Sequence, residues 1–136
     1  MNPTDTAVAE AYSQQGMDLL AAGKPQDAIE AFRLAMAADG NYFEAYHGMI
    51  RAMREAGRAE QAIATALALI ALTPKDPLAH TALSIALRDA GQIPEAEAAA
   101  GRARVLEWKM QLESPPDQNQ GNDLDLGRDL GKDLAR

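Results

Sequence analysis

The stretch LLAAGKPQDA at residues 19–28 returns as MREAGRAEQA at residues 53–62 and as LRDAGQIPEA at residues 87–96. In each copy an Ala-Gly pair is followed, five residues after the glycine, by another alanine, and the three glycines, Gly23, Gly57 and Gly91, are equally spaced along the chain. A fixed interval without insertions predicts a stack of similar units, here at about residues 9–42, 43–76 and 77–110. The repeat therefore decides the architecture.

Each repeat is predicted to be a helix, a short turn and a second helix. Apolar residues recur at helical spacing on both sides of the Ala-Gly pair, and the glycine accepts the left-handed backbone that ends a helix. Pro25 and Pro94 suit first helical positions, and Asp76-Pro77 suits an N-cap followed by such a position. We expect helices at about residues 5–22, 25–39, 42–56, 59–72, 77–90 and 93–112.

The composition favours an all-α fold. The chain of 136 residues contains 29 alanines, and alanine is the best helix former. Valine, isoleucine, threonine and the aromatic residues total only 19, which is too few for a sheet protein. The fold class predicted from composition and periodicity is all-α.

Charge and cysteine content limit the partners that we expect. A net charge of −7 and a pI near 4.7 disfavour binding to nucleic acid or to an anionic membrane. Without cysteine there are no disulfides or thiolate metal sites, and no apolar run approaches the length that a membrane span needs. The first ten residues, MNPTDTAVAE, do not look like a targeting segment, so we expect a cytoplasmic protein.

Further positions recur at the same interval. They are Tyr12, Leu19 and Ala28 in the first repeat, Tyr46, Met53 and Ala62 in the second, and His80, Leu87 and Ala96 in the third; Gly16, Phe32 and Pro74 mark three more positions of the repeat unit. This pattern resembles the tetratricopeptide repeat, a 34-residue helix pair. The resemblance implies a right-handed superhelix, or α-solenoid, of three helix-turn-helix units within residues 1–112. Trp108 stands where a repeat usually ends in proline, so the last helix should be extended.

The resemblance also implies a binding site. Tetratricopeptide stacks bind a peptide or helix of a partner protein in a concave groove lined by the first helix of each unit. Its positions fall in this chain on Glu10, Ser13, Gln14, Met17, Glu44, His47, Arg51, Arg54, Leu78, Thr81, Ile85 and Arg88. Three of these, Arg51, Arg54 and Arg88, could form a fork for carboxylates, which would favour an acidic partner. The alternative is that they are solvated residues paired with Glu55 or Asp89.

Nothing in the sequence points to catalysis, a metal or a cofactor. His80 stands in the aromatic position held by Tyr12 and Tyr46, so we expect it to pack between helices. His47 belongs to the predicted groove but has no second histidine or cysteine at ligand spacing. Nucleophile and phosphate-loop motifs are also missing. The chain is predicted to be non-catalytic.

The C-terminal residues differ in composition from the repeats. Residues 113–122, ESPPDQNQGN, read as a linker, and residues 123–136 carry a four-residue pattern of leucine and aspartate. On a helix the pattern would place Leu126, Leu130 and Leu134 in one row, with Asp129 and Asp133 beside it. Such a helix would dock in the groove or against the last helix. The alternative is a disordered acidic tail.

The function expected from these features is that of a non-catalytic adaptor or scaffold that binds a protein partner. One alternative is a small bacterial secretion or assembly chaperone, because some of these are tetratricopeptide stacks of similar size. A second alternative is a regulatory subunit whose own tail occupies the groove until it is displaced.

Overall fold

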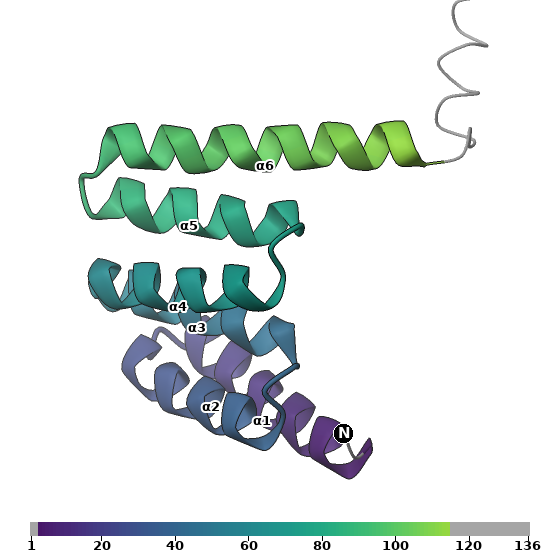
Figure 1. The fold of residues 1–136 in the computed structure, drawn as a ribbon. Helices are drawn as coiled ribbons and strands as arrows, with labels where there is room; N and C mark the ends of the chain where they lie inside the picture. The colour runs from purple at the N-terminus through teal and green to yellow at the C-terminus, as the bar shows by residue number, and fades with distance from the viewer. Residues whose placement is uncertain (1–2, 115–136) are drawn as a thin grey trace, which may run out of the picture. The chain divides into compact units, whose positions relative to one another are not determined.

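Six helices and no strand make up the described residues, 3–114, of the computed structural model (Figure 1). The helices are α1 (Pro3–Ala21), α2 (Pro25–Ala38), α3 (Phe43–Glu55), α4 (Ala59–Leu72), α5 (Pro77–Asp89) and α6 (Ile93–Glu113). All six predicted helices are present, and no end differs from its predicted position by more than two residues. The predicted all-α class is confirmed.

The chain divides into two units at Leu106. The first unit, residues 1–106, holds α1 to α5 and the larger part of α6. Of the second unit the structure describes residues 107–114, where α6 runs on to Glu113 as an extended last helix and exposes Trp108 and Leu112. The linker beyond residue 114 lies outside the described residues, and so do the predicted tail positions Leu126, Asp129, Leu130, Asp133 and Leu134. The boundaries predicted for linker and tail stay predictions.

The three turns within the repeats share one backbone structure. Gly23, Gly57 and Gly91 have φ angles of 76°, 77° and 80°, in the left-handed region that favours glycine. At the second turn the Arg58 N–H donates to the Met53 carbonyl at 2.8 Å, and the Gly57 N–H donates to the carbonyl of residue 54 at 3.0 Å. Equivalent pairs of bonds close the other two turns. The Ala-Gly pairs therefore end the first helix of each unit in a Schellman motif.

The alanine that follows each turn lies inside its unit. Ala28, Ala62 and Ala96 are fully buried. A methyl group lets two helices approach closely, and it stands at the same position in each unit.

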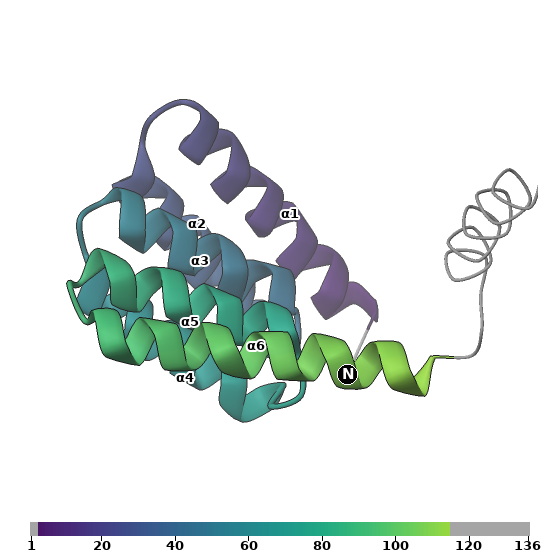
Figure 2. The ribbon, with the colours of Figure 1, turned by 90° about the horizontal axis from the view of Figure 1, so that it is seen from above.

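Packing between helices connects the units. Consecutive helices from α1 to α5 contact one another, and α1 also contacts α3 while α3 contacts α5 (Figures 1 and 2). The first helices of the three units therefore form a row. One buried cluster joins α1, α2 and α3, and another joins α3 to α6, so α3 belongs to both. None of the described helices is long and apolar enough to cross a membrane.

The first two units fill the space between their helices differently. Phe32 of α2 is fully buried, and a Cβ built on Gly16 of α1 would stand 2.7 Å from its ring. The ring also lies against Gly48 of α3, so it needs glycine on both neighbouring helices. In the second unit the positions of Gly16 and Phe32 are taken by Ile50 and Ala66, both buried. The first unit therefore carries the large side chain on its second helix, whereas the second unit carries it on its first helix.

Candidate functional site

The centre of the predicted groove is a hollow between α1 and α3. It has a volume of about 250 Å³ and is lined by Met17 from α1 and by Glu44, His47, Gly48 and Arg51 from α3. Met17 is 40% exposed, and His47 is half-buried. Four predicted site residues, from two units of the sequence, therefore lie around one depression with an apolar wall and both signs of charge.

The two arginines of α3 already have carboxylate partners. Arg54 Nε donates to Asp89 Oδ2 of α5 at 2.6 Å, and Arg51 Nε donates to Glu55 Oε2 at 2.9 Å. Among the described residues Arg88 is exposed and makes no ion pair. The pairing expected as the alternative to a fork is therefore present at two of the three arginines.

The third unit adds an apolar edge on α5. Leu78 is 62% exposed and Ile85 is 36% exposed, and Thr81 between them is half-buried. Positions three, four and seven residues apart lie on one face of a helix, so these side chains share a face. Large exposed apolar side chains that follow a helix face are typical of a surface that binds another protein.

The remaining predicted positions lie on α1. Glu10 and Gln14 are exposed, and Gln14 Nε2 donates to Asp18 Oδ1 at 3.0 Å. Ser13, by contrast, is only 7% exposed. The structure does not bring Ser13 to the surface of the groove, because the side of α1 that carries it is packed against other helices.

Tyr42 borders the N-terminus of α3. Burial, followed by the hydrogen bond from its hydroxyl to Glu44 Oε2 at 3.0 Å, raises the pKa of Tyr42 to about 12. Both causes disfavour the phenolate, because burial and a neighbouring carboxylate each oppose a further negative charge.

His80 has the packing role expected from its repeat position. Its ring is 8% exposed, and Nε2 lies 2.9 Å from the Pro74 carbonyl oxygen. Tyr46, which holds the equivalent position in the second unit, donates its hydroxyl to the Gly40 carbonyl at 3.0 Å. Both side chains therefore tie the start of a unit's first helix to the preceding turn. No cluster of three or more His, Asp or Glu side chains suited to a metal ion occurs in residues 3–114.

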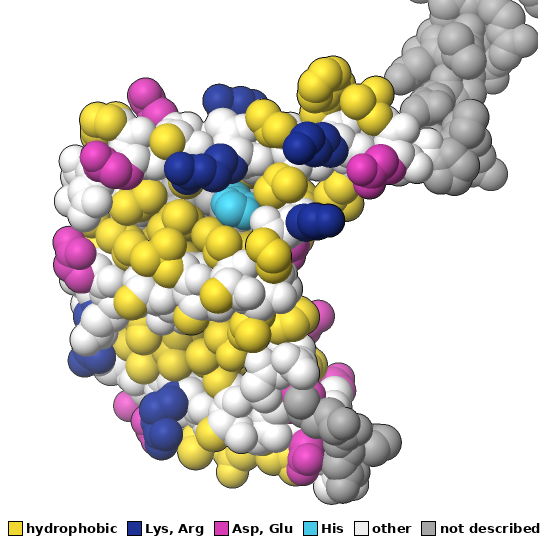
Figure 3. Space-filling view, viewed as in Figure 1, with side chains coloured by type: hydrophobic (Ala, Val, Ile, Leu, Met, Phe, Trp, Pro, Cys, Tyr) yellow, Lys and Arg dark blue, Asp and Glu magenta, His cyan; other side chains and the backbone are white. Residues whose placement is uncertain are grey.

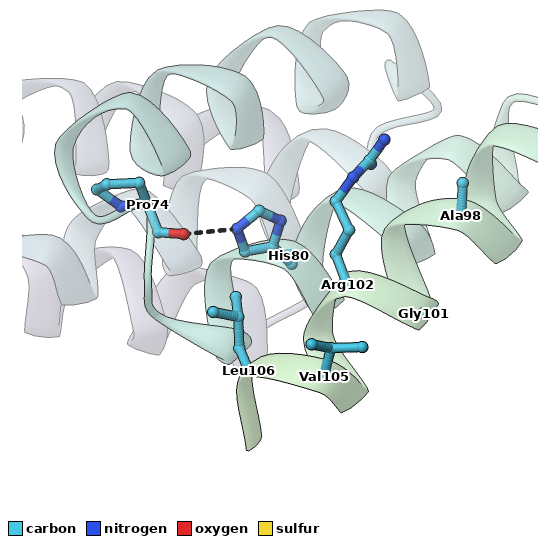
Figure 4. A pocket seen from close by; sticks show the side chains of 7 residues that line it. All are labelled: Pro74, His80, Ala98, Gly101, Arg102, Val105 and Leu106. Carbon is cyan, nitrogen blue, oxygen red and sulfur yellow. Dashed lines mark hydrogen bonds between the residues drawn. The ribbon is translucent and has the colours of Figure 1, made fainter. Parts of the chain in front are cut away.

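Sequence reasoning missed a second hollow, which shares no residue with the groove. It has a volume of about 560 Å³ and lies between Pro74 of the α4–α5 turn, His80 of α5 and the α6 residues Ala98, Arg102 and Val105 (Figure 4). In the view of Figure 3, hydrophobic side chains gather over α4 and α5, and basic side chains border them along α6. A comparison of side-chain size at repeat-equivalent positions would have revealed this hollow.

Comparisons with known proteins find solved structures that are similar to the helical stack. Two crystal structures of MamA are similar to the chain at 26% identity, with TM-scores of 0.70 and 0.71, and they cover 78% and 82% of it. The chain spans only 62% and 61% of the MamA chains. The Yersinia enterocolitica type III secretion translocator chaperone SycD (alternative dimer) matches over 91% of both chains with a TM-score of 0.70, but at 18% identity the likeness is one of fold alone.

No curated protein matches the sequence. The sequence model of the tetratricopeptide repeat matches residues 19–86, half of the chain. The matched range includes two turn glycines, Gly23 and Gly57, and the buried Ala28 and Ala62. Because the match, the repeat interval and the helix pairing coincide, the chain belongs to the tetratricopeptide repeat family.

Proposed function

We propose that this chain is a non-catalytic, cytoplasmic adaptor that binds a helix or extended segment of a partner protein along the row formed by α1, α3 and α5. The observation that carries the proposal is the hollow in which Met17 meets Glu44, His47 and Arg51. Membership of the tetratricopeptide family supports it, because this fold generally serves protein interaction.

The chemistry of the groove suits an amphipathic partner segment. Met17 at one end and Leu78 and Ile85 at the other offer apolar contacts. Arg88 is the arginine available to a carboxylate without displacing another, because Arg54 already holds Asp89. We expect a partner with apolar residues along one face and an acidic residue directed to α5.

A cross-linking experiment tests the location of the site. A photoreactive phenylalanine at position 47 should capture the partner, whereas the same residue at position 33 on α2 should not. His47 is half-buried in the hollow and Arg33 is exposed on α2, so the pair compares a groove position with an accessible control. Met17→Arg in the position-47 protein should abolish capture. Equal capture from both positions would show that the groove is not the binding site.

A second candidate is a chaperone for an exported subunit, favoured by the match to SycD over 91% of both chains. Co-expression separates the two functions. A chaperone keeps its partner soluble, so the captured protein should aggregate when it is produced without this chain. A partner that remains soluble on its own supports the adaptor.

A further inference from the structure

Two positions that line the hollow beside α6 carry smaller residues than their equivalents in the second unit. His80 stands where the second unit has Tyr46, and an imidazole ring is shorter than a phenol. Gly101 stands one repeat interval after Leu67, and a Cβ built on Gly101 would meet only the tip of the Arg104 side chain, 3.8 Å away. The third unit therefore has open space where the second unit carries larger side chains. At about 560 Å³ the hollow falls in the range of ligand sites.

One polar group in the wall of this hollow has no partner among the described residues. His80 Nδ1 is buried and makes no hydrogen bond within residues 3–114, although the ring is more than nine-tenths buried. The Pro74 carbonyl can only accept, so Nε2 carries the proton of the neutral ring and Nδ1 is left as an acceptor. Figure 4 shows the Nδ1 edge of the ring turned toward the Arg102 side chain.

A second polar group in the wall is also available. Arg102 is exposed and makes no hydrogen bond or ion pair with any other described residue. A guanidinium in this position attracts a carboxylate. Beside the apolar wall of Ala98 and Val105, the hollow thus has one exposed cation, and one acceptor lies buried behind its wall.

We propose that this hollow binds the C-terminal residue of a peptide whose last side chain is aliphatic. The side chain fills the apolar space, the terminal carboxylate pairs with Arg102, and the backbone N–H of the same residue donates to His80 Nδ1. Because Nδ1 is covered in the free protein, binding requires the wall of the hollow to open at this atom. This site is separate from the groove, so a partner could be held at both.

The proposed site requires an apolar side chain, a carboxylate for Arg102 and an N–H donor for His80 Nδ1, and simpler ligands lack one of these. An aliphatic acid without an N–H satisfies the wall and Arg102 but leaves Nδ1 unpaired. An amide-capped residue supplies the N–H but gives Arg102 no charge. A free amino acid also has N–H donors and a carboxylate, but its ammonium group places a positive charge near that of Arg102. An acylated residue with a free carboxylate meets all three without that charge.

Small probes separate these cases in an NMR titration of the full chain. N-acetyl-L-leucine should shift the His80 ring signals and the amide signals of residues 98–106 in a saturable way. N-acetyl-L-leucinamide, which lacks the carboxylate, and 4-methylpentanoate, which lacks the N–H, should each bind at least tenfold more weakly. Equal binding of all three would overturn the proposal in favour of an unselective apolar surface.

Two variants test the residues. Arg102→Gln should weaken N-acetyl-L-leucine about tenfold, whereas Arg33→Gln, which removes the same charge on α2, should change nothing. His80→Tyr restores the residue of the second unit and should fill the hollow and abolish binding. If that variant does not fold, Ala98→Leu fills the hollow from an exposed position on α6. Unchanged binding in Arg102→Gln, or in the variant with a filled hollow, would refute the assignment.

Discussion

Exchanging one packing pair between repeats tests whether each unit balances volume across its two helices. The pair is Gly16 and Phe32 in the first unit, and Ile50 and Ala66 in the second. Three variants are needed: Phe32→Ala, Gly16→Ile and the double variant. If volume balance governs the packing, each single change should be costly and the double change should cost much less than their sum.

The burial and contacts of these residues determine how much each change should lower the free energy of unfolding. Phe32 is fully buried, so Phe32→Ala should cost about 3–5 kcal/mol in the free energy of unfolding. Gly16→Ile should cost about 1–3 kcal/mol, because its Cβ alone would stand 2.7 Å from the Phe32 ring. In the double variant the isoleucine occupies space vacated by the ring, as Ile50 does beside Ala66. We expect it to be at least about 2 kcal/mol more stable than additivity predicts, a coupling typical of residues in contact.

Urea denaturation followed by far-UV circular dichroism measures all three unfolding free energies, provided that the m-value stays constant. Leu69→Ala combined with Gly16→Ile is the matched control, because Leu69 is fully buried in the other cluster. That pair should be additive to within about 0.5 kcal/mol. Additivity of the Gly16 and Phe32 changes to the same precision would refute the idea that the two positions share one space.

Three further outcomes follow from single positions. Ala62→Leu, at a fully buried site, should cost about 1–3 kcal/mol by overpacking, and an unchanged urea midpoint would contradict this. Gly57→Ala should lower stability by about 1 kcal/mol because its φ is 77°, whereas Gly40→Ala, with open space and no positive φ, should leave the midpoint unchanged. Tyr42, with its pKa raised to about 12 against about 10 in the unfolded chain, should ionise at a higher pH in the folded protein than in the unfolded chain, which an absorbance titration measures. Because the unfolded chain loses this proton first, Tyr42 should lower stability as the pH rises from about 10 to 12, and Tyr42→Phe should remove that part of the loss.

The sequence predicted helix positions well because their ends depend on local chemistry. The glycine at each turn requires a left-handed backbone, and Asp76 caps α5 by accepting the Leu78 N–H at 3.0 Å. Both signals act within a few residues of the end that they determine. Because the repeat interval is constant, a turn that is recognised in one unit predicts the position of the turn in the other two.

The candidate binding surface was harder to predict because it depends on distances between helices. The resemblance to the tetratricopeptide repeat assigns Ser13 to the groove, but the side of α1 on which it lies is buried. The hollow beside His80 depends on the size of side chains in two elements, and periodicity records only whether a position is apolar. Repeat-by-repeat comparison of volume, which sets His80 against Tyr46, is the additional reasoning that would have found it.

Because Arg51 and Arg54 already pair with carboxylates, we expect charge to contribute less, and apolar contact more, to the affinity of the groove for a partner. Arg54 and Asp89, with side chains 31% and 36% exposed, are 35 residues apart and link α3 to α5, so their pairing follows from the stacking of one unit on the next. An acidic partner that binds Arg54 must displace Asp89, and one carboxylate replaces another with little net gain. The larger gain comes from covering exposed apolar side chains such as Leu78, since burial of apolar surface contributes about 25 cal/mol per Å². Apolar contact should therefore supply most of the affinity of the proposed partner, and Arg88, which makes no ion pair within residues 3–114, should fix the direction in which that partner lies.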